Sequence, residues 1–319
     1  MNVLQQLKKL SKDTLFYGLG NAISRFINFF LFPLYTRLLT TEDYGAQDLI
    51  FTAITIISYF LVLGLDSASA RHYYDADTPQ EKSTILSTWL WFGMAISILA
   101  SILLILNAPI LCQLFFKDST LASYFQLGVA SFPLILISSI SMLTLRLTFK
   151  SKQFALVSVV GVLANALTAI YFVAIQRMGI TGVFISYLVA SAFRAVLGFM
   201  LTYKNYNFTF SPSWLRPMLA FGVPLVPASL SIWVMNYANR YFLVSYGTLA
   251  TVGLMGVATR ITNVITFVIT AFQMGWSPFA YSLVKEEQLA KMTYSKVLTV
   301  FLILLLSATV GLSVFAREI

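Results

Sequence analysis

Three polar residues lie inside the first long apolar stretch of the sequence, where a charge is costly. Asn21, Arg25 and Asn28 are spaced i, i+4 and i+7, so a helix places them on one face. A charge at the centre of a bilayer costs at least about 2.5 kcal/mol, and such residues therefore face a bundle interior or a watery cavity. A guanidinium binds anions such as phosphate, and asparagine amides can bind hydroxyl groups. The pattern predicts one wall of an anion-binding cavity.

Three further arginines also lie inside apolar stretches. Arg260 has a depth similar to that of Arg25, and we expect it on the opposite wall. Arg194 and Arg240 lie nearer to span ends, and Arg240 has Asn236 one turn earlier and Asn239 beside it. The alternative for each arginine is that it pairs with a helix-end carbonyl or extends to a membrane interface. The sequence leaves both interpretations open, most evenly for Arg194 and Arg240.

Acidic residues discriminate between transport mechanisms. Eleven of the twelve fall in predicted loops or at span ends, and Asp48 alone lies somewhat inside. We interpret Asp48 as a carboxylate in the first turn of a helix, with ion coupling as the alternative. A cation bound inside the membrane would need carboxylates within the bundle. The positive charge inside the predicted spans therefore favours an anionic substrate over a cationic drug.

Other chemistry lacks the residues that it needs. The chain has one cysteine, Cys112, and one histidine, His72, so neither a disulfide framework nor a Cys/His metal cluster is expected. It has no phosphate-binding loop of the form GxxxxGK[ST]. We expect no cofactor, no metal and no catalytic residue.

Composition determines how these residues must be positioned. The 319 residues are 58% apolar and 10% charged, and the mean hydropathy is +0.81. Such a chain cannot present a solvated surface, so the sequence predicts a protein dissolved in a lipid bilayer. The net charge of +9 comes from basic residues scattered singly between apolar runs, which argues against a nucleic-acid partner.

The apolar runs predict an all-α, polytopic bundle. Each run is long enough to cross the hydrocarbon core as a helix, and continuous apolarity excludes alternating barrel strands. The nine predicted spans are 14–38, 44–66, 83–107, 119–146, 153–176, 179–203, 218–244, 249–274 and 295–316. The loops on the amino-terminal side carry thirteen Lys and Arg against four on the other, which predicts a cytoplasmic amino terminus.

A weak internal repeat divides the chain. Gly18, Arg37 and Gly45 recur as Gly222, Arg240 and Gly253 at offsets of 204, 203 and 208. We therefore expect a six-helix lobe over 1–204 and the first three helices of a parallel repeat lobe over 205–319. On this interpretation the second lobe is incomplete and the chain is a fragment or a truncated product.

Prolines inside predicted spans are candidate hinges. Pro33 lies in the first span, and Pro224 and Pro227 lie in its repeat equivalent. Each removes a backbone donor and can bend the helix. The alternative is that they have no special role, because proline is common in membrane helices.

Three stretches resemble a known transporter family. LFPLYTRLLTTEDYG, LGLDSASARHYYD and FGVPLVPASLSIWVMNYANRYFL resemble the polysaccharide-exporter branch, the Wzx-type oligosaccharide flippases, of the multidrug/oligosaccharidyl-lipid/polysaccharide flippase superfamily. The resemblance implies two six-helix bundles around a central cavity. It also implies alternating access that moves a polyprenyl-diphosphate-linked oligosaccharide from the cytoplasmic to the outer leaflet of the cell (inner) membrane. Contacts with a polysaccharide polymerase and glycosyltransferases stay open.

Two other functions remain as alternatives. One is a cation-coupled multidrug exporter of the same superfamily, and the other is a membrane polysaccharide polymerase. A polymerase of this kind carries a large outer loop with arginines, whereas the predicted outer loops are short. The residue pattern favours a secondary transporter over an enzyme.

Overall fold

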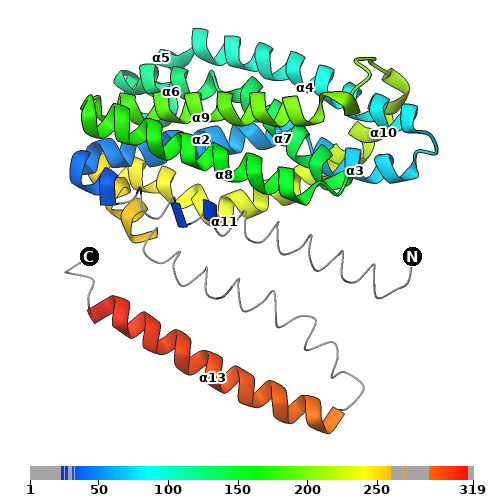
Figure 1. Ribbon diagram of the computed structural model, residues 1–319. Coiled ribbons are helices and arrows are strands. Elements are labelled where there is room, and N and C mark those ends of the chain that lie inside the picture. Colours follow the sequence, from blue (N-terminus) through cyan, green and yellow to red (C-terminus); the bar gives the residue numbers. More distant parts are fainter. Residues whose placement is uncertain are drawn as a thin grey trace. The chain divides into compact units, whose positions relative to one another are not determined.

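The computed structural model describes residues 23, 24, 26, 27, 31, 33–259, 269 and 287–314, and in these ranges its regular structure is helical (Figure 1). The chain divides into two compact units, Met1–Gly253 and Leu254–Ile319. The predicted lobe boundary at 204/205 stays a prediction, as does the repeat.

The described part of the first unit is a bundle of helices joined by short turns. In chain order its helices are α2 Thr41–Val62, α3 Leu65–Asp75, α4 Pro79–Leu106, α5 Ala108–Phe116, α6 Ala122–Val129, α7 Phe132–Leu147, α8 Ser151–Ala169, α9 Gly179–Thr202, α10 Pro212–Gly222 and α11 Val226–Tyr246. A π-helical segment, Ile170–Ile175, extends α8. Short 3-10 turns occupy Ser119–Leu121, Tyr203–Asn205 and Val223–Leu225.

The second unit contributes one long described helix, α13, over Glu287–Val314. A further apolar helix, Leu249–Thr259, follows α11.

Seven helical stretches among the described residues are long and apolar enough to cross a membrane. They are Thr41–Asp75, Pro79–Leu106, Ser119–Leu147, Ser151–Ile175, Gly179–Asn205, Pro212–Tyr246 and Tyr294–Gly311. Each matches one of the nine predicted spans, which confirms a polytopic all-α bundle. Of the predicted spans 14–38 and 249–274 the structure describes only parts, so the count of nine stays a prediction.

Helix starts follow local capping chemistry. Thr40 caps α2, and its hydroxyl accepts from the Asp43 backbone N–H while the Asp43 carboxylate accepts from the Thr40 N–H. Thr78 and Glu81 form the same reciprocal pair at α4. These capping boxes satisfy backbone donors that the first helical turn leaves free.

Two spans are broken partway along. The first break separates α2 from α3, where Leu63 and Gly64 have φ values of 51° and 67°. The second is the 3-10 turn Val223–Leu225 between α10 and α11. Gly64 and Gly222 lie against each other at these breaks. A Cβ on Gly64 would clash with the Gly222 carbonyl oxygen, and a Cβ on Gly222 would clash with that of Leu63. The predicted span 218–244 is therefore two helices.

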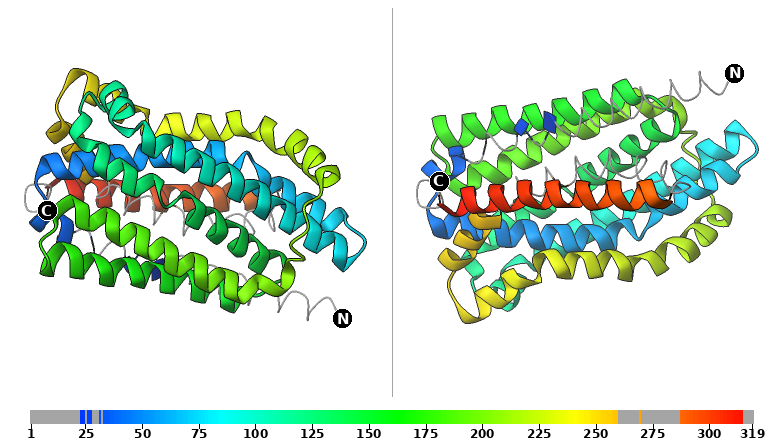
Figure 2. Two further views of the ribbon diagram at one scale, coloured as in Figure 1. Left: turned by 90° about the horizontal axis from the view of Figure 1, so that it is seen from above. Right: turned by 90° about the horizontal axis from the view of Figure 1, so that it is seen from below.

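Two large apolar clusters form most of the described core of the first unit, and a smaller one contains Leu145, Phe154 and Val157. One joins α2, α6 and α9 and includes Leu49, Phe125 and Phe184. The other joins α3, α4, α7 and α10 and includes Trp89 and Met218. Helix α10 therefore packs against helices of the first half of the chain. Helices α8 and α9 run side by side in both projections (Figures 1 and 2).

The segment 206–211, which links α9 to α10, is bonded to the side of α4. The backbone N–H groups of Asn207 and Phe208 donate to Ser87 Oγ at 3.1 and 3.2 Å. The Trp91 indole N–H donates to the Phe208 carbonyl at 2.9 Å. The link between the two predicted lobes is therefore fixed to the first lobe.

Glycines allow α2 to approach the helix that follows α11. A Cβ on Gly45 would clash with the carbonyl oxygen of Leu249, and a Cβ on Gly253 would clash with that of Thr41. Only a residue without a side chain fits at either position.

We expect Gly45→Ala to destabilise the protein. The added methyl meets backbone that cannot rotate away, and overpacking of this kind costs about 1–3 kcal/mol. Thermal unfolding of the purified protein in detergent measures the effect. The matched control is Gly311→Ala in α13, where an added Cβ meets nothing within 4 Å. Equal melting temperatures for the two variants would contradict the close approach.

Candidate functional site

Four residues predicted to line the anion-binding cavity lie outside the described residues. These are Asn21, Arg25, Asn28 and Arg260. Their assignment to a cavity stays a prediction. The structure does describe Arg194, Asn236, Asn239 and Arg240, together with the three candidate hinge prolines.

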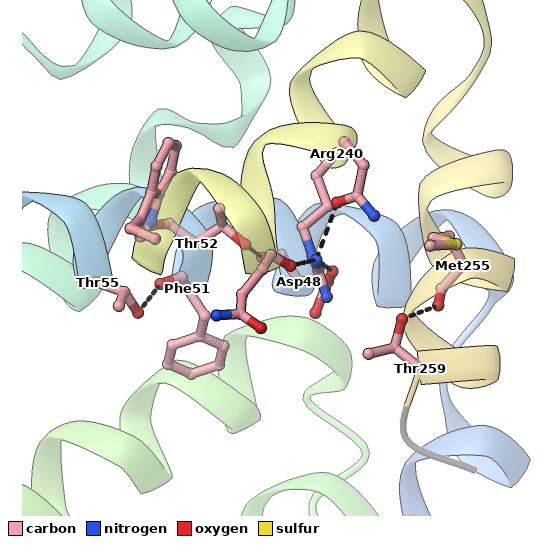
Figure 3. Close-up of polar contacts among 10 residues, drawn as sticks. Asp48, Phe51, Thr52, Thr55, Arg240, Met255 and Thr259 are labelled. Atoms are coloured by element: carbon pink, nitrogen blue, oxygen red, sulfur yellow. Dashed lines mark hydrogen bonds and ion pairs between the residues drawn. The ribbon is translucent and has the colours of Figure 1, made fainter. Parts of the chain in front are cut away.

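Arg240 forms an ion pair with Asp48 across the α2–α11 contact. Its Nε lies 2.5 Å from Asp48 Oδ2, and its side chain is only 4% exposed (Figure 3). Its Nη1 donates to the Asn236 carbonyl at 2.8 Å and to Asn239 Oδ1 at 3.1 Å. The guanidinium is thus compensated by one carboxylate and two acceptors on its own helix.

The interpretation of Asp48 as a first-turn carboxylate is wrong. Helix α2 begins at Thr41, and Glu42 and Asp43 occupy its first turn. Asp48 lies two turns into the helix and faces α11 instead. Its position reflects the cost of burying a guanidinium, which a partner carboxylate offsets. The sequence contained a signal for this pair, because Asp48 and Arg240 are oppositely charged and both lie inside predicted spans.

Aromatic residues of α11 lie beside the ion pair. The Arg240 guanidinium carbon lies 5.1 Å from the centre of the Tyr237 ring, within range of a cation–π contact. Trp233 packs on Tyr237 and Tyr241, and its indole N–H donates to the Thr52 carbonyl at 3.2 Å. Helices α2 and α11 are thus joined by an ion pair and, about one turn further along, by a side-chain hydrogen bond.

Asn236 and Asn239 have exposed side chains on α11. The Asn236 amide donates to the Ile232 carbonyl of its own helix at 2.8 Å, and Asn239 Oδ1 accepts from Arg240. The Asn236 carbonyl oxygen and the Asn239 amide nitrogen are therefore oriented by local bonds, and both side chains still reach the surface.

Arg194 is the described intramembrane arginine without a carboxylate partner. It lies on α9 about 12 Å from that helix's carboxyl end, and its Nε is buried with no hydrogen-bond partner. The guanidinium packs against Gly161 of α8, where a Cβ would come within 2.5 Å of Nε. Within the described part of the chain no Asp or Glu oxygen lies within 4.0 Å of it. Arg194 is thus a half-buried cation between packed helices, with no carboxylate partner among the described residues.

The candidate hinge prolines occupy different local settings. Pro224 lies inside the 3-10 turn between α10 and α11, and Pro227 lies in the first turn of α11, where a missing N–H is tolerated. Pro33 is helical, as are residues 34–38. The break at Leu63–Gly64 was not predicted, although the LGLD sequence contains a glycine that accommodates its positive φ.

Thiol and metal chemistry find no support among the described residues. Cys112 is buried in α5, outside the seven spans, and burial together with nearby Asp118 raises the pKa of its thiol to about 11. A thiol with that pKa is protonated and inert at neutral pH. No group of three or more His, Cys, Asp or Glu side chains in the described ranges is arranged to hold a metal ion.

Comparisons with known proteins identify the family of the chain. The model of the polysaccharide biosynthesis protein family matches residues 34–319. The chain is 23% identical over 282 residues to Lsg locus putative protein 1 of Haemophilus influenzae, covering 88% of this chain and 68% of that protein.

Solved transporters share the fold. The MATE multidrug transporter DinF-BH matches with a TM-score of 0.70 and 17% identity, covering 97% of this chain and 75% of that one. An inward-facing multidrug resistance MATE family transporter of the MOP superfamily matches with a TM-score of 0.70 and 18% identity, covering 95% and 70%. The chain therefore belongs to the polysaccharide biosynthesis protein family, as the sequence resemblance predicted, and it has the fold of MATE transporters.

Proposed function

We propose that this protein translocates a polyprenyl-diphosphate-linked oligosaccharide from the cytoplasmic to the outer leaflet of the cell (inner) membrane. The glycan would serve cell-surface polysaccharide biosynthesis, and the movement would occur by alternating access through a cationic central cavity. The family match and the transporter fold support this proposal. Contacts with a polysaccharide polymerase and glycosyltransferases are part of the same proposal.

The proposal of an anionic substrate rests on Arg194, whose charge has no carboxylate partner among the described residues. Arg240 is neutralised by Asp48, whereas Arg194 has no carboxylate within 4.0 Å among the residues described. A half-buried cation without a carboxylate partner is stabilised when an anionic ligand reaches it. A diphosphate is such an anion, and a guanidinium binds it through charge-assisted hydrogen bonds.

We assign the remaining polar residues by chemistry. Arg25 and Arg260 bind the diphosphate from opposite walls, and Asn21 and Asn28 bind sugar hydroxyls. Asn236 and Asn239 lie in the carboxyl-terminal half of α11 with exposed amides, and they contact the glycan there. Arg240 holds the helix on which these two asparagines lie.

The α2–α11 contact supports a mechanism for alternating access. The Asp48–Arg240 ion pair lies about 24 Å along α2 from Gly64, where the two helix breaks meet. We propose that the ion pair is a latch and that the breaks, with Pro224 and Pro227, are the pivot. Pro33 is a second candidate hinge. Opening the latch would separate the two helices at that end of the contact.

The multidrug alternative needs a free carboxylate inside the bundle. Asp48 is the best described candidate, and Arg240 occupies it. A cationic drug or a coupling proton would have to displace that guanidinium. The geometry therefore favours the anionic glycolipid, although the fold itself is shared with multidrug transporters. A polymerase has no specific observation in its favour.

Topology reporters test the orientation. A reporter fused after Arg37 is expected on the outer side and one fused after Lys152 on the cytoplasmic side, because the excess of cations faces the cytoplasm. Alkaline phosphatase and fluorescent-protein fusions provide complementary readouts. The reverse pattern would overturn the direction of transport.

Substitution of the proposed diphosphate ligands tests the cavity. Arg25→Ala and Arg260→Ala are each expected to lower glycan export at least tenfold, because loss of one charge-assisted contact costs about 1.5–3 kcal/mol. The assay is complementation of a flippase-deficient strain at matched expression. Arg146→Ala, an exposed arginine at the end of α7, is the control. Normal glycan export by both cavity variants would refute the anion site. Export of drugs instead of the glycan would favour the multidrug exporter.

A double-mutant cycle tests the ion pair. Asp48→Asn leaves a buried guanidinium uncompensated and is expected to destabilise the protein by about 3–5 kcal/mol. Replacing both partners, as in Asp48→Leu with Arg240→Met, should restore most of that loss because no buried charge remains. Melting temperatures in detergent measure both effects. A double variant no more stable than Asp48→Asn would show that the pair is not coupled.

A further inference from the structure

A second basic site lies away from the proposed cavity, where the start of α4 meets the end of α9. A cavity of about 360 Å³ opens there, and its lining includes Lys82 and Ser83 from α4 and Lys204 and Asn205 from the turn that follows α9. None of these residues has a part in the transport path proposed above. The site lies within the first compact unit.

The two lysines make the cavity electropositive. Lys82 Nζ lies 5.5 Å from the centre of the Tyr73 ring, and Lys204 Nζ lies 5.8 Å from that of Tyr203. No carboxylate of the described residues lies within 4.0 Å of either amine. The neighbouring acid, Glu81, accepts backbone N–H groups at the start of α4. Two ammonium groups with no carboxylate partner favour an anion between them.

The lining also contains an acceptor that lacks a donor. Asn205 Oδ1 is buried and has no hydrogen-bond partner. Such an atom costs free energy unless a ligand or water supplies a hydrogen. A bare phosphate dianion has no hydrogen to give, whereas a polyol linked to phosphate has several. The ligand that fits both features carries a phosphate and a hydroxyl group.

The cavity opens at the level of the membrane surface. The membrane span that contains α4 begins at Pro79, and the span that contains α9 ends at Asn205. Exposed Tyr74 and Tyr203 flank this end of the bundle, as tyrosines do at membrane–water interfaces. Leu86 provides an apolar wall one turn deeper in α4. Lipid head groups occupy this level of a bilayer.

We propose that this cavity binds the head group of an anionic glycerophospholipid. Lys82 and Lys204 hold the phosphate, and a glycerol hydroxyl donates to Asn205 Oδ1. The acyl chains lie along the apolar face below Leu86. The bound lipid joins the start of α4 to the end of α9, next to the segment 206–211 that is already bonded to α4.

Lipid binding to the purified full-length chain in detergent tests the site. Short-chain phosphatidylglycerol should raise the melting temperature more than phosphatidylcholine of equal chain length. Lys82→Gln and Lys204→Gln should each weaken phosphatidylglycerol binding about fivefold, and the double variant about 25-fold, because one lysine near an anionic lipid surface contributes about 1 kcal/mol. Neither side chain is buried, so the fold should be retained.

Matched variants isolate the cavity. Arg146→Gln with Lys150→Gln removes two charges from the turn between α7 and α8, at the same end of the bundle by span order, and should leave lipid binding unchanged. Asn205→Ala should weaken phosphatidylglycerol but not phosphatidic acid, which lacks the glycerol hydroxyls. Unchanged phosphatidylglycerol selectivity in the lysine double variant would refute the site.

Two further probes distinguish the source of the phosphate. Inorganic phosphate at millimolar concentration should not reproduce the stabilisation, and farnesyl diphosphate should not displace phosphatidylglycerol. Full stabilisation by phosphate alone would reassign the cavity to a soluble anion. Displacement by the diphosphate would reassign it to a lipid diphosphate. Either result would overturn the phospholipid assignment while leaving the export assay of Arg25 and Arg260 independent.

Discussion

A charge buried among membrane helices must meet an opposite charge, and this constraint determines how the described bundle is joined. Arg240 of α11 is almost completely buried, so Asp48 of α2 is positioned two turns inside its helix to compensate it. Helix α2 also approaches the helix after α11 at Gly45, and the turn after α2 approaches the end of α10 at Gly64, because neither glycine has a side chain. The ion pair joins α2 to α11, and the glycines permit the other two close contacts. Arg194 lacks such compensation, which is why it points to an anionic ligand.

Hydropathy predicted the fold closely because it is a local property of the sequence. The seven described spans match predicted runs, and the all-α class follows from the absence of water in the bilayer. The breaks at Leu63–Gly64 and Val223–Leu225 are harder to predict. A membrane helix tolerates glycine and proline without breaking, and only the packing of the two breaks against each other specifies them here.

The site was less predictable than the fold because compensation of charge is a tertiary property. Sequence depth alone identified Arg240 as unusual but left its partner open, and Asp48 was assigned to a helix end. No local signal states which arginine meets a carboxylate 192 positions away. Conversely, the sequence did separate Arg194 and Arg240 from the loop cations, and the structure then distinguished the two by their partners.

The segment 206–211 and α10 connect the two halves of the chain, but both are attached to the first half. Met218 of α10 is buried in the cluster that includes Trp89 of α4, so α10 is carried by helices that precede it. The peptide that connects the proposed halves is therefore not where they can rotate apart. With the pivot proposed above, relative movement would begin after Gly222. Helix α10 would then move with the first lobe, and the boundary between the moving parts would lie about one short helix beyond the predicted boundary between the repeats.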